Sequence, residues 1–589
     1  MYVTPWFDSI NNKPLQEYPR PQLVRNSYIS LNGYWDFEVN KLPLTSTYSK
    51  SILVPFSPET VASGLAMTIN PDDFMHYRRF FTLSDDFMLD RVLLNFEAVD
   101  QECYVYVNTM KVGTHIGGYD SFSIDITDFI RPGNNELVVR VVDQTEKSGY
   151  VRGKQKLNNK GKMSSIFYTP NSGIWQSVWL ESVPNNYVKH VDIAPNFDDA
   201  SFDITIHSLM DDYADVHVFD KFGDVRTQTL LTNQKHTLEL LNFTSWCPDN
   251  PHLYDVTITL EDDVVNTYFG MRKFSKTIDS HGVSRFTLNN KPFFFLGILD
   301  QGYWPESLLT APSDEALIFD IETMKDLGFN TLRKHVKVES SRFYYHCDRI
   351  GMVVWQDMPN GGGVDNPWFA TYLPNVSTYA ARNVKDNHHW LFKRKDRKAK
   401  EFFYMELDAM IQQLKHFPSI AVWVPFNEGW GQFDAPVATK RILDNDPSRL
   451  INEACGWYDQ GGGDVFSIHN YLRRLHVKPQ GERVVSLTEY GGYAFPIKDH
   501  VMYEESFGYK YYKTLDEYEY AIQDLVYSQI IPNIKSGLST TIYTQLSDVE
   551  KEINGLVTYD RRVIKTNKEL IRKLNQDVIN VFNEIQNIF

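Results

Sequence analysis

After residue 280, short apolar segments alternate with stretches of helical periodicity. Eight apolar segments can be counted: 293–297, 331–335, 353–357, 421–428, 450–455, 464–471, 484–489 and 539–545. Helical patterns lie between them, for example at 314–327 and 341–350. Strand–helix alternation predicts a parallel sheet covered by helices, and eight units predict a (β/α)8 TIM barrel. Such a barrel carries its chemistry on the loops at the carboxyl ends of its strands.

The first 276 residues follow a different pattern. Short segments that alternate apolar and polar residues, such as 91–99 and 135–143, are separated by turn residues. A polar join near 183–186 divides this all-β part, so we predict two β-sandwiches of unequal size. Trp175, Trp179 and Trp246 are expected in the sandwich cores. Segment 152–155 lies in a long connection that could reach the mouth of the barrel from the first domain, although a solvated loop is the first expectation.

The charge balance narrows the range of partners. The chain of 589 residues has 59 Lys+Arg and 75 Asp+Glu, a formal net charge of −16. A surplus of this sign disfavours attraction to nucleic acid and to anionic membranes, so neither is expected as a partner. A neutral partner fits this balance better. Aromatic residues make up 14% of the chain, and aromatic faces commonly support sugar rings.

The cysteines and the first residues bear on the compartment. Cys103, Cys247, Cys347 and Cys455 lie far apart, which disfavours a disulfide framework or a zinc site and predicts buried, reduced thiols. The first residues lack the basic and apolar regions of a signal peptide. No apolar run approaches the roughly 20 residues of a membrane span. A cytoplasmic location is therefore the expectation.

Polar residues end several of the predicted barrel strands. Because the carboxyl ends of parallel strands share one rim of a barrel, we expect these side chains to converge there. They are Asp300, Arg333, His335, Asp357, Asn427, Glu428, His469, Tyr471, Glu489 and Gln545. Glu428 ends the fourth strand and Glu489 the seventh, on roughly opposite sides of the mouth. Two carboxylates about 5 to 5.5 Å apart can cleave a glycosidic bond with retention, one as nucleophile and one as acid.

Three motifs resemble those of glycoside hydrolase family 2, which includes β-galactosidases, β-glucuronidases and β-mannosidases. They are Tyr268-Phe-Gly-Met-Arg-Lys273, Pro425-Phe-Asn-Glu-Gly-Trp430 and Thr488-Glu-Tyr-Gly-Gly492. The segment 246–254 is also similar to one in the middle domain of the family. The resemblance implies a multidomain chain: an N-terminal jelly-roll β-sandwich of sugar-binding type at 1–182, an immunoglobulin-like β-sandwich at 183–276, and a catalytic TIM barrel at 277–589.

Carried over position by position, the resemblance implies that Glu428 is the acid/base and Glu489 the nucleophile. Asn427 would hydrogen-bond the sugar 2-hydroxyl, while Arg333 and Tyr471 would orient Glu489 and keep it ionised. The spacing after Arg333 is one residue shorter than in the family pattern Arg-x-Ser-His-Tyr-Pro. Further sugar contacts are expected from His335, Asp357, His469, Trp430 and Gln545.

The expected activity is that of a retaining exo-β-glycosidase, which removes the non-reducing terminal sugar of a neutral glycan by double displacement. Glucuronidases of the family carry an Asn-x-Lys whose ammonium pairs with the uronate, whereas this chain has Glu552-Ile-Asn554 there. A carboxylate would repel a uronate, which favours a neutral sugar. Among neutral sugars, a β-galactoside is the first expectation. The alternatives are a β-mannoside, β-glucoside, α-L-arabinoside or β-glucuronide, and Trp355-Gln-Asp357 resembles mannosidases more than galactosidases.

No organic cofactor is implied, and no local cluster of ligands predicts a metal site. The rival from another class is a non-catalytic carbohydrate-binding protein on the same scaffold, against which the presence of Asn427, Glu428 and Glu489 counts. The stretch 356–400 is long for a barrel loop. It has the length to cap a pocket or to mediate contact between subunits of a homo-oligomer.

Overall fold

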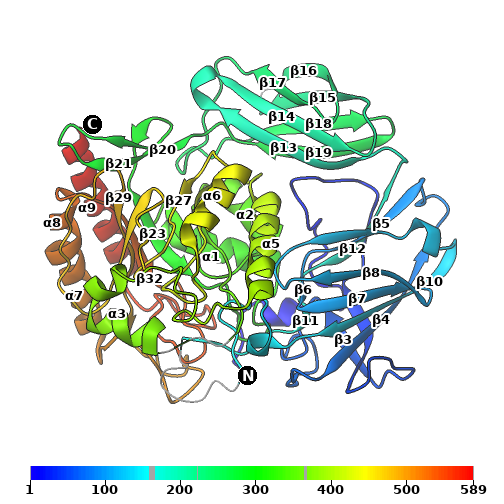
Figure 1. Ribbon diagram of the computed structural model, residues 1–589, viewed down its shortest axis with the longest axis horizontal. Coiled ribbons are helices and arrows are strands. Elements are labelled where there is room, and N and C mark those ends of the chain that lie inside the picture. The colour runs from blue at the N-terminus through cyan, green and yellow to red at the C-terminus, as the bar shows by residue number, and fades with distance from the viewer. Residues whose placement is uncertain (1, 158–165, 222, 364–365, 367, 588–589) are drawn as a thin grey trace.

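The computed structural model of the chain describes residues 2–157, 166–221, 223–363, 366 and 368–587. Two β-sandwiches lie against a barrel of strands and helices, with the N-terminal sandwich in blue and the second sandwich in cyan and green (Figure 1). The parallel barrel strands and the two antiparallel sandwiches confirm the predicted fold class.

The N-terminal sandwich packs a six-stranded antiparallel sheet, ordered β3-β2-β4-β10-β7-β8, with a four-stranded one, ordered β1-β12-β5-β9. In β10 (Gly133–Val142) alternate residues are buried, because successive side chains of a strand point to opposite faces. The other strands are β1 (Tyr28–Ser30), β2 (Gly33–Asn40), β3 (Lys50–Val54), β4 (Phe74–Leu83), β5 (Arg91–Phe96), β7 (Glu102–Val107), β8 (Met110–Ile116), β9 (Phe122–Asp125) and β12 (Val178–Val183).

The second sandwich has a three-stranded sheet, β13-β14-β17, and a four-stranded sheet, β16-β15-β18-β19. Phe202, Val216 and Ile258 are buried in its core. Its strands are β13 (Val188–Asn196), β14 (Ser201–Ser208), β15 (Tyr213–Asp220), β16 (Gly223–Leu231), β17 (Lys235–Glu239), β18 (Tyr254–Leu260) and β19 (Asp263–Phe269).

Eight parallel strands form the barrel in the order β27-β26-β25-β24-β23-β32-β29-β28. They are β23 (Phe295–Asp300), β24 (Thr331–Lys334), β25 (Val353–Asp357), β26 (Ile420–Val424), β27 (Leu450–Ile451), β28 (Val465–Asn470), β29 (Val484–Gly491) and β32 (Leu538–Thr544). Each of the eight predicted segments contains one of these strands or overlaps it. Among the described residues, no ladder joins β27 to β28, so the barrel is nearly closed.

Helices cover the outside of the barrel (Figure 1). The two predicted at 314–327 and 341–350 are confirmed as α1 (Asp314–Asp326) and α2 (Ser341–Ile350). The Ser313 side chain caps α1 by accepting a hydrogen bond from the backbone N–H of Ala316. The longer ones after them are α5 (Arg397–Leu414), α6 (Ala435–Asn445), α7 (Leu515–Leu525) and α9 (Lys568–Gln586). Within the described ranges, none of the helices is both long and apolar enough to cross a membrane.

An aromatic plug closes the amino-terminal end of the barrel. A small sheet of β20 (Phe274–Ile278), β21 (Ser284–Leu288) and β22 (Lys291–Pro292) lies there. The ring centroid of Phe286 is 4.9 Å from that of Phe295 and 6.0 Å from that of Trp355. These side chains belong to one buried cluster that includes the first residues of several barrel strands.

Two of the tryptophans expected in sandwich cores lie at junctions with the barrel, so that prediction was wrong for them. Trp246 packs in the plug cluster, and its Nε1 donates to the carbonyl of Asp348 at 2.7 Å. Trp175 packs in the main barrel cluster, and its own carbonyl accepts a 2.5 Å hydrogen bond from Thr310 Oγ1. Trp179 is buried on β12. Apolar periodicity marks a side chain as buried but does not reveal which neighbour buries it.

Candidate active site

The carboxyl ends of the barrel strands bring two glutamates and a histidine together. One oxygen of Glu428, one oxygen of Glu489 and a ring nitrogen of His469 lie within 4.8 Å of one another. Both carboxylates are about 5% exposed. This spacing fits a retaining pair, whose carboxyl groups are about 5 to 5.5 Å apart, better than an inverting pair at about 6.5 to 9.5 Å.

Glu489 lies on β29 among hydrogen-bond donors. Arg333 Nη1 donates to its Oε1 at 3.0 Å, and the Tyr471 hydroxyl donates to its Oε2 at 2.6 Å. Burial opposes ionisation of this carboxyl, but His469 and Arg333 outweigh burial and lower its pKa. Glu489 is therefore ionised at neutral pH, as a nucleophile must be.

Arg333 organises the neighbouring groups. Its Nε and Nη2 each donate to a different oxygen of Asp357 at 2.9 Å, and Nη2 also donates to Asn427 Oδ1 at 2.8 Å. The guanidinium is fully buried, and this bidentate geometry fixes its plane. The amide oxygen of Asn427 accepts this bond, and its amide nitrogen has no acceptor among the described residues. Within the described part of the chain, that nitrogen is a free donor near Glu489.

Glu428 follows β26 in a strained backbone conformation. Its φ is 52°, in the left-handed region that few non-glycine residues adopt, and its N–H donates to the carbonyl of Cys455 at 2.8 Å. Gly429 continues the turn with φ 73°, and a Cβ on it would come within 2.3 Å of the Tyr458 ring. Burial and the charge of Glu489 raise the pKa of Glu428. The two carboxyls are thus driven to opposite protonation states.

His469 lies between the glutamates. Its Nδ1 is 2.7 Å from Glu428 Oε1 and 3.3 Å from Glu489 Oε2, and its Nε2 is 3.2 Å from Cys455 Sγ. Burial lowers the pKa of this imidazole, but Glu489, Cys455 and Glu428 together raise it to about 10. The ring is therefore an imidazolium that shares its charge with both carboxyls.

Cys455 was not singled out from the sequence, although it ends the fifth predicted strand. Its Sγ touches the far side of the His469 ring, and Arg333 and His469 lower the pKa of the thiol against the effect of burial. All four cysteines are free, and three are buried as expected, whereas Cys247 is only half-buried. The position at a strand end was the signal that could have identified Cys455.

Glu428, His469 and Glu489 are close enough to hold a metal ion, and they are the only such group of three in the described ranges. A protonated imidazole has no lone pair to offer a metal, and the pKa of His469 is raised to about 10. The donor set therefore suits proton chemistry better than metal binding. The prediction of no metal site stays a prediction.

The other predicted site residues differ in how close they come to this centre. His335 Nδ1 lies 2.9 Å from Asp357 Oδ2, and burial with the nearby Lys154 and Arg333 holds the pKa of His335 far below its usual value. Asp357 is fully buried against Arg333 and His335, which suits a positioning group. Gln545 binds Gln301 and Asn554, and no described contact joins it to either glutamate.

The segment 152–155 is buried rather than solvated, so the expectation of a solvated loop was wrong. Arg152, Lys154 and Gln155 are each 6% exposed or less. The Arg152 N–H donates to the carbonyl of Asn360, on the loop after β25. Trp430, beside Glu428, has its ring 5.9 Å from Lys154 Nζ and 5.1 Å from the Phe167 ring. The N-terminal sandwich therefore reaches the rim of the barrel.

The long insertion after β25 packs behind the turn that carries Glu428. Phe369 and Phe392 form a buried cluster with Trp457 and Tyr458. The ring centroids of Phe369 and Tyr458 are 5.0 Å apart, and Tyr458 is the residue that a Cβ on Gly429 would strike. The described part of the insertion thus supports the turn that carries Glu428 from outside.

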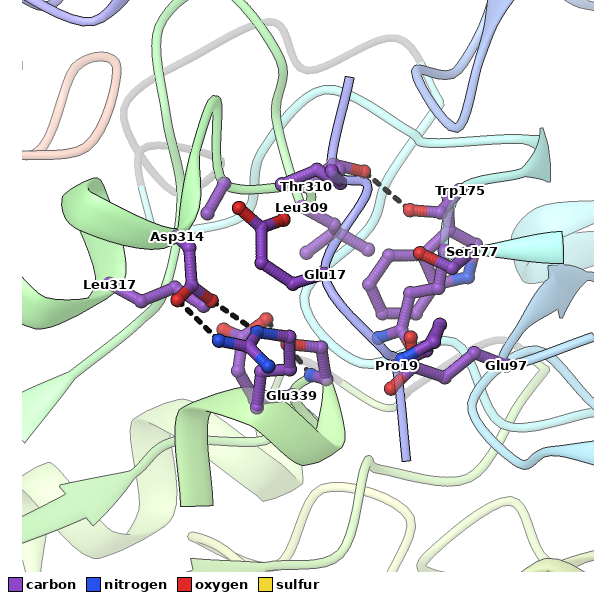
Figure 2. A pocket seen from close by; sticks show the side chains of 15 residues that line it. Glu17, Pro19, Glu97, Trp175, Ser177, Leu309, Thr310, Asp314, Leu317 and Glu339 are labelled. Carbon is purple, nitrogen blue, oxygen red and sulfur yellow. Dashed lines mark hydrogen bonds and ion pairs between the residues drawn. The ribbon is translucent and has the colours of Figure 1, made fainter. Parts of the chain in front are cut away.

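A separate pocket lies where the N-terminal sandwich meets the barrel (Figure 2). Its lining includes Glu97 and Trp175 from the sandwich and Asp314 and Glu339 from the barrel. Burial raises the pKa of Glu97 to about 7. The cavity volume is about 40 Å³, which admits water but is far below the roughly 300 Å³ of small-molecule sites. We assign no sugar to this pocket.

Known proteins are similar to this chain in sequence and in fold. The chain is 24% identical to a β-galactosidase of Thermoanaerobacter pseudethanolicus over 72% of its length, but it spans only 54% of that protein. It is 22% identical to a β-glucuronidase of Streptococcus agalactiae serotype V, over 87% of this chain and 91% of that protein. Its fold is similar to the structure of a β-D-glucuronidase of Dictyoglomus thermophilum, with a TM-score of 0.73, 19% identity and coverage of 95% and 98%.

Family models cover most of the chain. The model described as the sugar binding domain of glycosyl hydrolases family 2 matches residues 22–184, and a second model of that family matches 186–272. The TIM barrel domain model of the same family matches residues 281–576, half of the chain by itself. The order sandwich, sandwich, barrel is the same in the models and in the structure. The chain belongs to glycosyl hydrolases family 2.

Proposed function

We propose that the protein is a retaining exo-β-glycosidase. The observation that carries this proposal is the pair of buried carboxyls, Glu428 and Glu489, whose oxygens lie within 4.8 Å and whose pKa values are shifted in opposite directions. A raised pKa keeps the proton that an acid must give, and a lowered pKa keeps a nucleophile ionised.

In the first step, Glu489 attacks the anomeric carbon while Glu428 gives its proton to the departing glycosidic oxygen. The C–O bond to the aglycone breaks and an ester bond to Glu489 forms. In the second step, Glu428 takes a proton from water, the water oxygen attacks the anomeric carbon, and the ester bond breaks. The free amide nitrogen of Asn427 is suited to the sugar 2-hydroxyl, where a hydrogen bond strengthens in the transition state.

His469 stabilises the negative charge as it moves between the glutamates. In the free enzyme the charge is on Glu489, 3.3 Å from Nδ1. After the first step Glu489 is a neutral ester and Glu428 is ionised, 2.7 Å from the same nitrogen. One imidazolium thus serves both states, so that neither carboxylate is left unpaired in a buried site.

The glycone is the finer part of the proposal. We propose a β-galactoside as the first substrate to test, in line with the relatives named β-galactosidase, and a β-glucuronide as the second, in line with those named β-glucuronidase. Repulsion of a uronate by Glu552 supports the first. That carboxylate, however, accepts hydrogen bonds from the Tyr168 hydroxyl at 2.5 Å and from Asn554 Nδ2 at 3.1 Å, which reduces its effect.

A screen of nitrophenyl α- and β-glycosides tests the proposal, with Glu489→Gln as the inactive control. We expect release of nitrophenol from at least one β-glycoside, and NMR of the first sugar product should show the β-anomer. An initial α-anomer would contradict double displacement. A non-catalytic binding protein would hydrolyse none of the glycosides while its unfolding midpoint rises with added sugar.

A further inference from the structure

Lys154 is a buried cation without an ionic partner. It is 6% exposed, and no described residue accepts a hydrogen bond or forms an ion pair with its ammonium. Lysines are rarely buried unless they are paired, because a charge removed from water needs a counter-charge or several hydrogen bonds. An unpaired ammonium in the interior therefore calls for a functional explanation.

The other buried lysines of the described chain all have carboxylate partners. Lys334 Nζ lies 2.6 Å from Asp300, Lys337 Nζ 2.5 Å from Glu339, and Lys565 Nζ 2.6 Å from Asp548. Each of these three lysines is paired with a carboxylate of the barrel itself. Lys154 differs from them because it comes from the N-terminal sandwich and ends beside the catalytic rim.

The backbone around Lys154 is held firmly. Its carbonyl accepts a 2.9 Å hydrogen bond from the N–H of Tyr168, and the preceding Arg152 is bonded to the barrel loop at Asn360. A Cβ on Gly153 would come within 2.8 Å of the Val336 carbonyl at the end of β24, so the segment is wedged against the barrel. The position of the side chain is thus set before any ligand binds.

The ammonium lies at the active site. Its Nζ is 5.9 Å from the centroid of Trp430, two residues after Glu428, and 5.6 Å from that of Tyr168. The same charge contributes to lowering the pKa of His335 and opposes the increase in the pKa of Glu428. Lys154 therefore faces the space in which the proposed function places the sugar.

We propose that Lys154 binds an anionic group, a carboxylate or a sulfate, on the sugar at this site, so that the preferred substrate is an acidic glycoside. The inference rests on the proposed glycosidase function. It replaces the neutral β-galactoside that the proposed function puts first, because that choice depended on Glu552. The Glu552 carboxylate is already bonded to Tyr168 and Asn554, whereas the Lys154 ammonium has no counter-charge among the described residues, and an acidic sugar would supply one.

The test compares substrates that differ only at C6: nitrophenyl β-galacturonide with β-galactoside, nitrophenyl β-glucuronide with β-glucoside, and a 6-sulfated galactoside with its parent. The measured quantity is the ratio of kcat/KM for the acidic substrate to that for the neutral one. We expect the wild type to favour one acidic substrate and Lys154→Met to lower its ratio at least tenfold. Lys154→Arg should restore part of it. Lys156→Met, the matched control two residues away, should keep it within about twofold.

Equal losses on both substrates would overturn the inference, because Lys154 would then act only through the electrostatics of Glu428. A wild type that prefers every neutral substrate would overturn it as well. Which of the carboxylate and sulfate pairs responds identifies the anionic group.

A binding measurement separates this inference from the glycosidase proposal. In a Glu489→Gln background, galacturonate, glucuronate or galactose 6-sulfate should raise the unfolding midpoint more than galactose does, and Lys154→Met should remove that excess. Lys154-dependent binding, together with a wild type that hydrolyses no glycoside, would support the anion site alone and contradict the glycosidase function. Hydrolysis by the wild type, with an acidic-to-neutral ratio of kcat/KM that Lys154→Met leaves unchanged, would support the glycosidase function and contradict the inference.

Discussion

The two ends of the barrel bury different kinds of side chain. At the amino ends of the strands, Phe286, Phe295 and Trp355 form an apolar plug with ring centroids 4.9 to 6.0 Å apart. At the carboxyl ends, Glu428 and Glu489 are buried with Arg333 and His469 in a network of charges. Single strands contribute to both ends: β28 carries Val465 of the plug cluster and His469, and β29 carries Val484 of the plug cluster and Glu489.

The difference shows how the fold divides stability from chemistry. Burial of the aromatic rings stabilises the barrel, since it removes apolar surface from water at about 25 cal/mol per Å². Burial of charges does not stabilise in the same way, because desolvation offsets most of the attraction between them. The strained φ of Glu428 adds to the unfavourable side. The charged carboxyl end therefore lowers the stability of the barrel while it provides reactive groups, and burial of the apolar plug offsets this loss.

Glu489→Gln is expected to show the largest difference between the two ends of the barrel, because it should remove activity with little effect on stability. Loss of the nucleophile should lower kcat/KM by about 10⁴-fold or more on every β-glycoside that the wild type hydrolyses. The unfolding midpoint should stay closer to that of the wild type than the midpoint of a plug variant does. Steady-state kinetics and thermal unfolding of the same preparations measure both. Wild-type activity in this variant would exclude Glu489 as the nucleophile.

The acid/base is tested by Glu428→Ala. We expect kcat for substrates with poor leaving groups to fall about 10²- to 10⁴-fold, because the leaving oxygen must then depart unprotonated. For substrates with good leaving groups, whose limiting step in this variant is attack on the ester, azide should restore turnover, since it needs no general base, and the product should be a β-glycosyl azide identified by NMR. An α-glycosyl azide would contradict the two-step mechanism.

At the opposite end, Phe286→Ala should act on stability. Phe286 is fully buried in the plug, and loss of its ring should lower the free energy of unfolding of the barrel by about 3–5 kcal/mol. Activity per folded molecule at low temperature should remain near that of the wild type. Phe80→Ala, at a half-exposed position on β4, is the control with a change near zero. A loss of activity without a loss of stability in Phe286→Ala would break the division between the two ends.

The smallest effect is expected from Tyr471→Phe, which removes the hydroxyl that donates to Glu489 at 2.6 Å. That bond helps to lower the pKa of Glu489, so its loss should raise this pKa. A nucleophile is active above its pKa, and the acidic limb of the kcat/KM profile should therefore move to higher pH, with about tenfold lower activity. Tyr490→Phe, which alters the next residue along β29, should leave the limb in place. An unchanged limb in Tyr471→Phe would exclude the hydroxyl from tuning Glu489.

The local patterns of the sequence predicted the barrel and its two glutamates well. Segment 353–357 is β25 and segment 341–350 is α2, because apolar periodicity and turn residues act over a few neighbouring positions. The strand ends at Glu428 and Glu489 follow from the same local signal. The predicted barrel puts Arg333, Asp357 and Glu489 on one rim, but only the structure gives the hydrogen bonds from Arg333 to the two carboxylates.

What the sequence by itself determined is the order of the three folded parts and the strand ends that carry the candidate catalytic pair. Only the tertiary structure decided that Lys154 is buried at the catalytic rim, that Cys455 contacts His469, and that Trp246 belongs to the junction with the barrel. The physical reason is the distance along the sequence between the residues that interact. Secondary structure follows from contacts between near neighbours, whereas Lys154 and Trp430 are brought together by the docking of two domains whose interacting surfaces no local period encodes.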